Sequence, residues 1–386
     1  MRSHLAKLSL LGAPALFAAC AQLLSYDDYS ARSTTPDTGA TAIDASTEVF
    51  DRADGADAGD GLKRPPTRPE GDPKASGKGK TITFAVKRMY LGSLTALGAE
   101  TADAWKEWGY DLDSVCTSLS DSKANINTCK RPAEANQDSL TDGDGCADNN
   151  FGHHVIGLIK LSSSGFEQRL NSGLLDGNNT WIVRIDDLDD GEDDAYAPAR
   201  FYRSATLPKP KWDGTDAFDV LDDSVLDGSL DKPRVAFPRG YVRGNVWVSG
   251  EPELRNFTLP LSDTVLVPLT LDAATVTFKL TPDHSSGSRG VLSGAIPLAT
   301  IDTLLYPVAT NAGICPGSGL YVSLWNSIQR FPDVVIGAPN LQNTSRQCNG
   351  ISLGIGLDGA PVRLPTKVVS AGTPPVDKCD AGVSPG

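Results

Sequence analysis

A short acidic loop at positions 140–150, LTDGDGCADNN, carries the strongest chemical signal in the sequence. Asp142, Asp144, Asp148 and Asn149 offer side-chain oxygens within eight residues, and two intervening glycines let the backbone turn. Calcium takes about six to eight oxygen ligands, and alternating carboxylates on a glycine-rich loop can supply several of them. The loop therefore predicts a calcium site. An Asx-rich turn, whose carboxylates accept backbone N–H groups, explains the same composition and stays open as the alternative.

The segment DGDGCADN within this loop resembles the calcium-binding loops of thrombospondin type 3 and dockerin-like repeats. Asp142, Asp144 and Asp148 match the ligand positions of those loops. The sequence holds one copy of the segment, and it lacks the glutamate that closes an EF-hand loop. The resemblance implies calcium as the bound ion.

A second acidic cluster spans Asp186–Asp194 and holds seven carboxylates in nine residues. Such charges repel one another unless water or a cation neutralises them. Because the cluster directly follows the apolar segment 181–185, we expect a loop at the edge of a sheet. We interpret it as a solvated loop, with a metal site as the alternative.

Signals for nucleophilic catalysis or a zinc site are weak. GISLG at 350–354 matches the G-x-S-x-G pattern of a nucleophile elbow, which needs a histidine later in the chain. All four histidines precede Ser352, and apolar residues alternate around it as in a strand. His153 and His154 are adjacent and have no third ligand at a zinc-binding spacing. Paired carboxylates for glycoside cleavage stay open, because their separation is a property of the folded chain.

The cysteines indicate an oxidising compartment. Besides Cys20 there are six, and an even number in an exported chain predicts three disulfides. They fall into two groups of three, so at least one bridge must join the groups if all six pair. That bridge would tie both ends of the folded region into one domain. The groups are Cys116, Cys129 and Cys146, and Cys315, Cys348 and Cys379.

The N-terminus has the features of an export signal. A short basic region precedes the apolar run LSLLGAPALF at 8–17, which is too short for the roughly 20 residues that span a bilayer. The segment FAAC at 17–20 resembles a bacterial lipobox with Cys20 as the acylated residue. Ala21, where an aspartate would imply inner-membrane retention, implies the outer membrane. An ordinary signal peptide cleaved near Ala19 is the alternative.

Composition divides the rest of the chain into a tether and a folded domain. Residues 31–80 hold one large aromatic residue, Phe50, and cannot bury enough apolar surface to fold. The chain carries 48 acidic against 35 basic residues, a formal charge of −13 that disfavours nucleic acid as a partner. We expect a signal peptide at 1–19, a lipid-anchored N-terminus at 20–30, a disordered tether at 31–80, one disulfide-linked β-rich domain at 81–379 and a tail at 380–386.

Alternating β-branched and aromatic runs predict most of the folded elements as strands, with few helices between them. This pattern indicates a mainly β, antiparallel, β-sandwich-like single domain with a few helical insertions, and an α+β fold is the alternative. The expected strands are 81–86, 180–185, 241–248, 264–269, 274–280 and 350–357, and the expected helices are 102–108, 154–175, 298–305 and 320–331.

A broader resemblance links the export signal to the acidic loop. A lipobox cysteine followed by LLSYDDY, a low-complexity tether, GYDLD at 109–113 and DGDGCADNNFG at 142–152 look like a group of myxobacterial secreted lipoproteins without an assigned activity. The resemblance implies location, and it implies that Asp111 and Asp113 complete the cation shell of the loop. Alternatively, Tyr110 and Leu112 pack inward and the two aspartates face water.

Two classes of function follow. The first is an outer-membrane or cell-surface lipoprotein with a non-catalytic, calcium-stabilised binding or structural module. Its candidate partners are a glycan or a surface protein, bound through exposed aromatics such as Trp105, Trp108 and Trp212. The second is an extracellular, glycan-directed hydrolase with paired carboxylates. An open cleft with two facing carboxylates would favour the hydrolase.

Overall fold

The computed structural model describes most of the chain after residue 61. The described residues are 62–71, 74, 77, 79–119, 128–131, 140–162, 165–250, 253–261, 265–311, 313–372 and 378–379. The expected signal peptide, Cys20, the lipid-anchored N-terminus and the tether up to residue 61 lie outside these ranges, as does the tail from residue 380. Within the ranges, no helix has the length and apolar character needed to cross a membrane.

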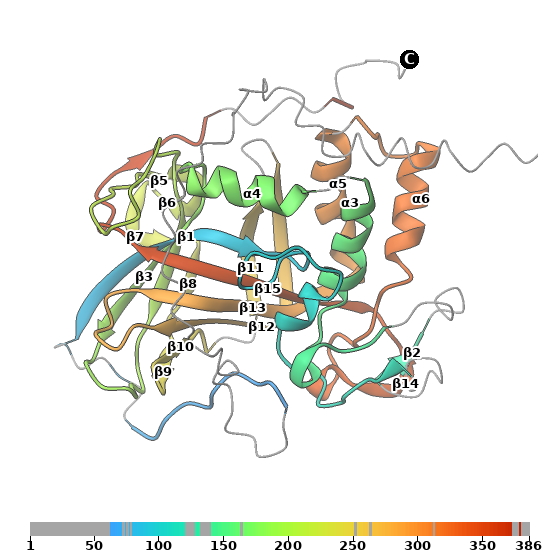
Figure 1. Ribbon diagram of the computed structural model, residues 1–386, viewed down its shortest axis with the longest axis horizontal. Coiled ribbons are helices and arrows are strands. Elements are labelled where there is room, and N and C mark those ends of the chain that lie inside the picture. Colours follow the sequence, from blue (N-terminus) through green and yellow to red (C-terminus); the bar gives the residue numbers. More distant parts are fainter. Residues whose placement is uncertain are drawn as a thin grey trace, which may run out of the picture.

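A large antiparallel sheet dominates the described part of the chain (Figure 1), and ten strands belong to it there. The strand β11 (Glu253–Pro260) pairs with β12 beside the main path. Along that path the order is β8 (Val235–Phe237), β4 (Ala199–Arg203), β3 (Trp181–Leu188), β1 (Lys80–Tyr90), β15 (Gly350–Pro361), β13 (Gly287–Pro297), β12 (Leu266–Leu280), β10 (Val246–Val248) and β9 (Tyr241–Arg243).

The sheet curls until strands from its two sides face each other. The Trp181 ring of β3 lies 4.0 Å from the Phe257 ring of β11, and Trp181 Nε1 donates to Thr258 O at 2.8 Å. The short strand β8 also contacts β11. The side chains inside the curl form the main hydrophobic core. This arrangement confirms the prediction of a mainly β, antiparallel domain with a few helical insertions.

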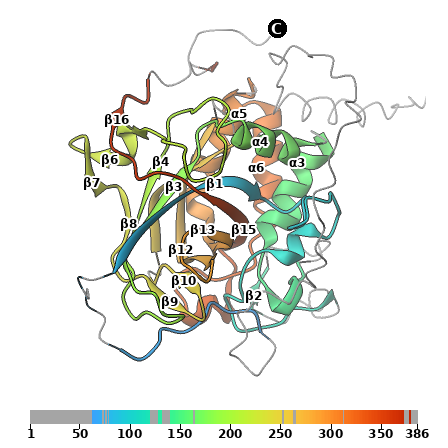
Figure 2. The same ribbon diagram turned by 60° about the vertical axis from the view of Figure 1, so that its left-hand side comes forward.

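The remaining elements are short and lie around the sheet (Figures 1 and 2). The paired strands are β14 (Asn343–Gln347) with β2 (Cys129–Lys130), β16 (Val368–Val369) with β5 (Val220–Leu221), and β6 (Val225–Leu226) with β7 (Ser229–Pro233). The helices are α3 (Ile156–Ser162), α4 (Phe166–Leu175), α5 (Ile301–Asn311) and α6 (Gly319–Ile328), with a π-helical turn η4 (Phe151–Val155) and the 3-10 turns η1 (Ala104–Glu107), η3 (Asp144–Cys146), η5 (Asp222–Ser224), η6 (Leu298–Thr300) and η7 (Pro339–Leu341).

Two predicted elements are divided in the structure. The helix expected at 154–175 becomes η4, α3 and α4, and Gly165, with φ of +70°, is the N-cap residue before α4. The strand expected at 241–248 is the hairpin β9–β10, because Gly244 and Asn245 both have positive φ and form its turn. Glycine and asparagine are the residues that tolerate this backbone at low cost.

The cysteines pair as the odd number in each group requires, with one disulfide joining the two groups. Cys129–Cys348 joins them across 219 residues, while Cys116–Cys146 and Cys315–Cys379 each lie within one group. All six cysteines outside the export signal are therefore paired, as predicted. A bridge that closes so long a loop constrains the unfolded chain strongly.

The folded region begins earlier than the sequence suggests. Residues 62–69, which we expected in the tether, lie along the domain at the lower edge of Figures 1 and 2. Arg64 pairs with Asp111 at 2.9 Å, and Arg68 lies 4.5 Å from the ring centre of Tyr241. Low hydrophobicity concealed these contacts, because they are made by basic side chains and backbone atoms.

Glycines in β15 admit the side chain of Trp108. A Cβ built at Gly356 would lie 2.3 Å from the Trp108 ring, whereas one at Gly157 in α3 would meet nothing within 4 Å. We expect Gly356→Ala to destabilise the domain by at least about 1 kcal/mol through overpacking. Gly157→Ala, the matched control, should be neutral or stabilising because alanine favours helix. Urea unfolding of both variants measures the difference, and equal stability would contradict this packing.

Candidate metal centre

Two loops are held side by side at one end of the sheet. Residues 109–117 follow η1, and residues 142–150 run through η3 toward η4. Asp148 N donates to Tyr110 O at 3.0 Å, Asp142 N donates to Thr117 O at 3.1 Å, and the Cys116–Cys146 disulfide links the loops covalently. Gly109, with φ of +108°, allows this approach, since a Cβ there would lie 2.9 Å from Asp148 O. The pairing fixes which side chains of the two loops meet.

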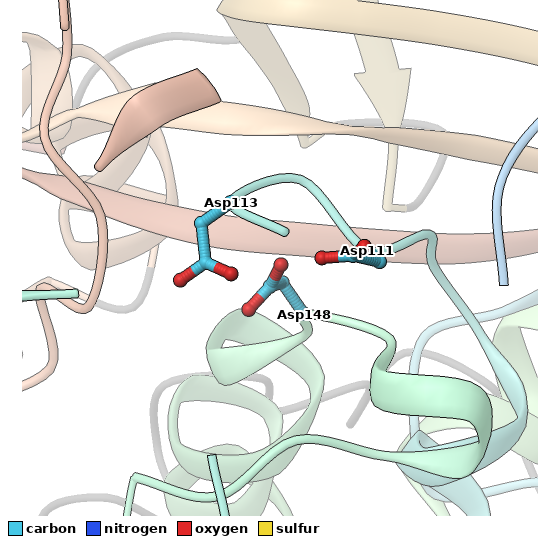
Figure 3. Close-up of side chains that lie close together, drawn as sticks. All are labelled: Asp111, Asp113 and Asp148. Carbon is cyan, nitrogen blue, oxygen red and sulfur yellow. The ribbon is translucent and has the colours of Figure 1, made fainter. Parts of the chain in front are cut away.

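Asp111, Asp113 and Asp148 converge between these loops (Figure 3). One carboxylate oxygen from each lies within 4.8 Å of the others, and the three residues are only 7%, 2% and 3% exposed. Two oxygens bound to one calcium ion are at most about 5 Å apart, because each Ca–O distance is about 2.3–2.6 Å. The limit of 4.8 Å on the separation of the three oxygens is therefore compatible with one calcium ion between them.

Backbone N–H groups orient all three carboxylates. Leu112 N donates to Asp148 Oδ2 at 2.7 Å, Ser114 N to Asp111 Oδ1 at 2.7 Å, and Val115 N to Asp113 Oδ1 at 2.8 Å. The Thr128 hydroxyl also donates to Asp113 Oδ2. The side chains are thus fixed before any ion arrives, and each carboxylate oxygen has lone pairs beyond those that these donors use.

Burial and mutual repulsion disfavour the charged forms of this cluster. Burial, then the charges of Asp113 and Asp142, raise the pKa of Asp148 well above its ordinary value. Burial also raises the pKa of Asp113 to about 6 and, together with the charges of Asp113 and Asp333, that of Asp142 to about 8. Carboxylates so close together ionise readily only beside positive charge. Either bound protons or a cation would neutralise the cluster.

The chain already supplies positive charge at the edge of the cluster. Arg64 contacts Asp111 Oδ2 through Nε at 3.0 Å and through its terminal nitrogen at 2.9 Å. Lys63 Nζ donates to Glu107 O at 2.6 Å, and burial lowers the pKa of Lys63 to about 8. The single positive charge of Arg64 cannot neutralise three carboxylates. Its Nε and terminal nitrogen both contact Asp111.

The other predicted ligands of the acidic loop behave differently. Asp142 lies near the triad and accepts from Thr117 N at 2.5 Å, whereas Asp144 is exposed in η3. Asn149 is buried, but its Oδ1 already accepts from Gly152 N at 3.0 Å and Gly354 N at 2.8 Å. The structure therefore brings Asp111, Asp113 and Asp148 together with Asp142 beside them, and directs Asp144 and Asn149 elsewhere.

Asp333 was not anticipated from the sequence. Its pKa is raised to about 7, first by burial, and it accepts from Ser352 Oγ at 2.5 Å and Ser352 N at 2.8 Å. Asp333 raises the pKa of Asp148 and Asp142 through its charge. It lies in an unremarkable segment far along the chain, and no spacing rule relates it to the acidic loop. Ser352 is fully buried in β15, which confirms its expected place within a strand.

The aromatic side chains expected at the surface are mostly buried. Trp105 stacks on His153 at 4.0 Å, and Trp108 stacks on Tyr90 at 4.8 Å. They are only 2% and 6% exposed, so the expectation of an aromatic binding face containing them is wrong. Trp212 is partly buried, and its Nε1 donates to Leu175 O at 3.0 Å. These rings pack the domain because the sheet glycines and the histidine pair accommodate them.

The second acidic cluster consists of turn and ion-pair contacts. Asp186 pairs with Arg184 at 2.7 Å and Asp193 with Arg243 at 2.9 Å. Asp194 accepts from the backbone N–H of Asp189 at 3.0 Å. In the ranges that the structure describes, the one group of three or more metal-ligating side chains close enough to hold a metal ion is the Asp111, Asp113 and Asp148 triad. The expectation of a loop at a sheet edge is only partly right, because residues 186–188 form the end of β3, which lies between β4 and β1, and the loop begins at Asp189.

Comparison with family models, with curated proteins and with solved structures gives no match for this chain. The geometry of the aspartate triad and the signals in the sequence are therefore the basis for any assignment of function.

Proposed function

We propose that this protein is an exported, lipid-anchored, non-catalytic module whose folded domain is stabilised by calcium. The observation that carries the proposal is the buried triad of Asp111, Asp113 and Asp148. Burying three carboxylates costs free energy unless they are neutralised or paired. A calcium ion between the three oxygens would reduce that cost, because it supplies two positive charges and the oxygens lie within 4.8 Å of one another.

In this proposal the calcium ligands come from two loops, so the ion links these loops instead of binding within a single loop. Asp111 and Asp113 come from the loop after η1, and Asp148 comes from the loop between η3 and η4. An ion between them would add a third link to the backbone hydrogen bonds and the Cys116–Cys146 disulfide. Thermal unfolding of the full chain with calcium, with magnesium and without either tests this role.

A glycan-directed hydrolase has less support from the geometry. Its two carboxyl groups must flank a bound sugar and reach the glycosidic oxygen and a water molecule. Asp111, Asp113 and Asp148 are at least nine-tenths buried, and backbone donors occupy part of each carboxylate. A raised pKa, which a general acid also needs, follows here from burial and crowding. Those features suit a structural cation better than a sugar.

The location rests on the sequence. The apolar run at 8–17 and the lipobox-like FAAC at 17–20 favour acylation of Cys20, and three disulfides are compatible with an oxidising compartment. We expect radiolabelled palmitate to enter the wild-type protein in a bacterial host and to be lost in Cys20→Ala. Cys116→Ala, which removes a cysteine of the folded domain, should keep the label. Equal labelling of wild type and Cys20→Ala would remove the lipid anchor from the proposal.

A further inference from the structure

Residues 62–69 form a basic strap that binds beside the aspartate triad. Lys63 N donates to Gly145 O at 2.7 Å, and Asp111 N donates to Lys63 O at 2.8 Å. Arg64 then turns its guanidinium onto Asp111 Oδ2. The strap thus contacts both loops of the candidate metal centre, and one of its contacts is with a proposed ligand.

The far end of the strap is held at β9. The Tyr241 hydroxyl donates to Pro66 O at 2.6 Å, and the Arg68 guanidinium lies over the Tyr241 ring. Arg68 also donates to the backbone carbonyls of Ala195, at 2.5 Å, and Arg239. Docking therefore depends on hydrogen bonds, an ion pair and a cation–π contact at two separate ends.

Arg64 and a metal ion would share Asp111. The Arg64 Nε and a terminal nitrogen both contact Asp111 Oδ2, and the Arg64 side chain is 36% exposed while that of Asp111 is 0% exposed. A divalent ion bound to Asp111 withdraws negative charge from this oxygen and repels the guanidinium a few ångströms away. Contacts of a partly exposed arginine are the ones that can yield to such a change.

We propose that the strap is a releasable internal counter-cation, so that strap docking and divalent-cation binding at the triad oppose each other. The inference rests on the proposed calcium site and adds its regulation. Arg64 partly neutralises Asp111 when the site lacks an ion, and calcium displaces the strap when it binds. Because linkage is reciprocal, anything that holds the strap in place weakens calcium binding by the same factor.

Calcium titration calorimetry on the full chain tests this coupling with three variants. Arg64→Gln removes the competing charge at Asp111 and should tighten calcium binding about tenfold, a coupling of ordinary size. Arg68→Gln loosens the far end of the strap without touching the triad, and it should tighten binding by a smaller factor. Lys232→Gln removes the same charge from the exposed Lys232–Asp227 pair and should leave the affinity unchanged.

Amide hydrogen exchange gives an independent readout. The N–H groups of Lys63 and Asp111 form the backbone hydrogen bonds of the docked strap, so calcium should accelerate their exchange. A purely structural arginine would leave calcium affinity equal or weaker in Arg64→Gln, and calcium would then slow both amides. That outcome overturns the strap proposal while the calcium site stands. If neither wild type nor Arg64→Gln binds calcium, the proposed function fails and this inference fails with it.

Discussion

Calcium is expected to raise the melting temperature of the full chain, and Asp148→Asn is expected to abolish the rise. A ligand that binds only the folded state adds RT ln(1 + [L]/Kd), which is about 2.7 kcal/mol at 100 times Kd. Extracellular calcium modules bind at roughly 0.1 to 1 mM, so 10 mM calcium should add about 1.4 to 2.7 kcal/mol. Magnesium at the same concentration should add less, because it demands near-ideal octahedral geometry and gives up its bound water reluctantly.

The two aspartate variants separate the triad from the rest of the acidic loop. An asparagine at position 148 keeps an oxygen for the Leu112 N–H group but removes the buried charge. Asp144→Asn changes the same residue type in the same loop at an exposed position, so it should retain the full calcium response. Identical melting curves with calcium and with chelator in the wild type would mean that the loop is a turn without a metal.

Without divalent cations, the domain is expected to lose stability as pH rises from 6.5 to 8.5. Folding raises the pKa of Asp333 to about 7, that of Asp142 to about 8, and that of Asp148 well above its ordinary value. A carboxyl with a raised pKa binds its proton more tightly in the folded state. Its stabilising contribution is therefore complete below the unfolded pKa of about 4 and is lost as pH passes the folded pKa.

The chosen pH window excludes His153 and includes an opposing group, Lys63, whose pKa burial lowers to about 8. A lowered lysine pKa makes stability rise with pH, so Lys63 offsets a smaller part of the loss near the top of the window. Burial lowers the pKa of His153 to about 3, so its opposite effect on stability falls below pH 6.5. At about 1.4 kcal/mol for each pKa unit, we expect the metal-free wild type to lose at least about 2 kcal/mol across the window. Urea unfolding in metal-free buffers measures this loss. It should shrink in Asp142→Asn, whose amide imitates the protonated acid, and calcium should reverse it. Stability that rises with pH in metal-free wild type would contradict the account.

The sequence located part of the candidate site and gave a poorer indication of which residues belong to it. Residue type and spacing predicted cation ligands in the acidic loop, and the resemblance to secreted lipoproteins added Asp111 and Asp113, which the structure places beside Asp148. Spacing could not show that Asp144 faces solvent, because that depends on the positive φ of Gly145 and Cys146 in η3. Composition alone cannot report how a short turn directs each side chain.

The parts of the fold that the sequence did not predict have one physical cause: their structure depends on contacts with residues far away in the sequence. The strand β13 is rich in glycine and serine, yet it is buried because Gly287 and Gly290 leave room for Phe84 and Phe278. The composition of the strap predicts a tether, because its residues include few large apolar side chains and its hydrogen-bond partners, such as Asp111 and Tyr241, lie far along the chain. Patterns in the local sequence predict neither the burial of β13 nor the contacts of the strap.

The most direct test of the calcium site is the anomalous scattering of calcium in crystals of the full domain. The account predicts one strong peak between Asp111, Asp113 and Asp148, with carboxylate oxygens at about 2.3 to 2.6 Å from its centre. The peak should vanish in crystals of Asp148→Asn and persist in those of Asp144→Asn. A triad without a peak at 10 mM calcium, or a peak confined to the exposed acidic loop at 186–194, would contradict the account.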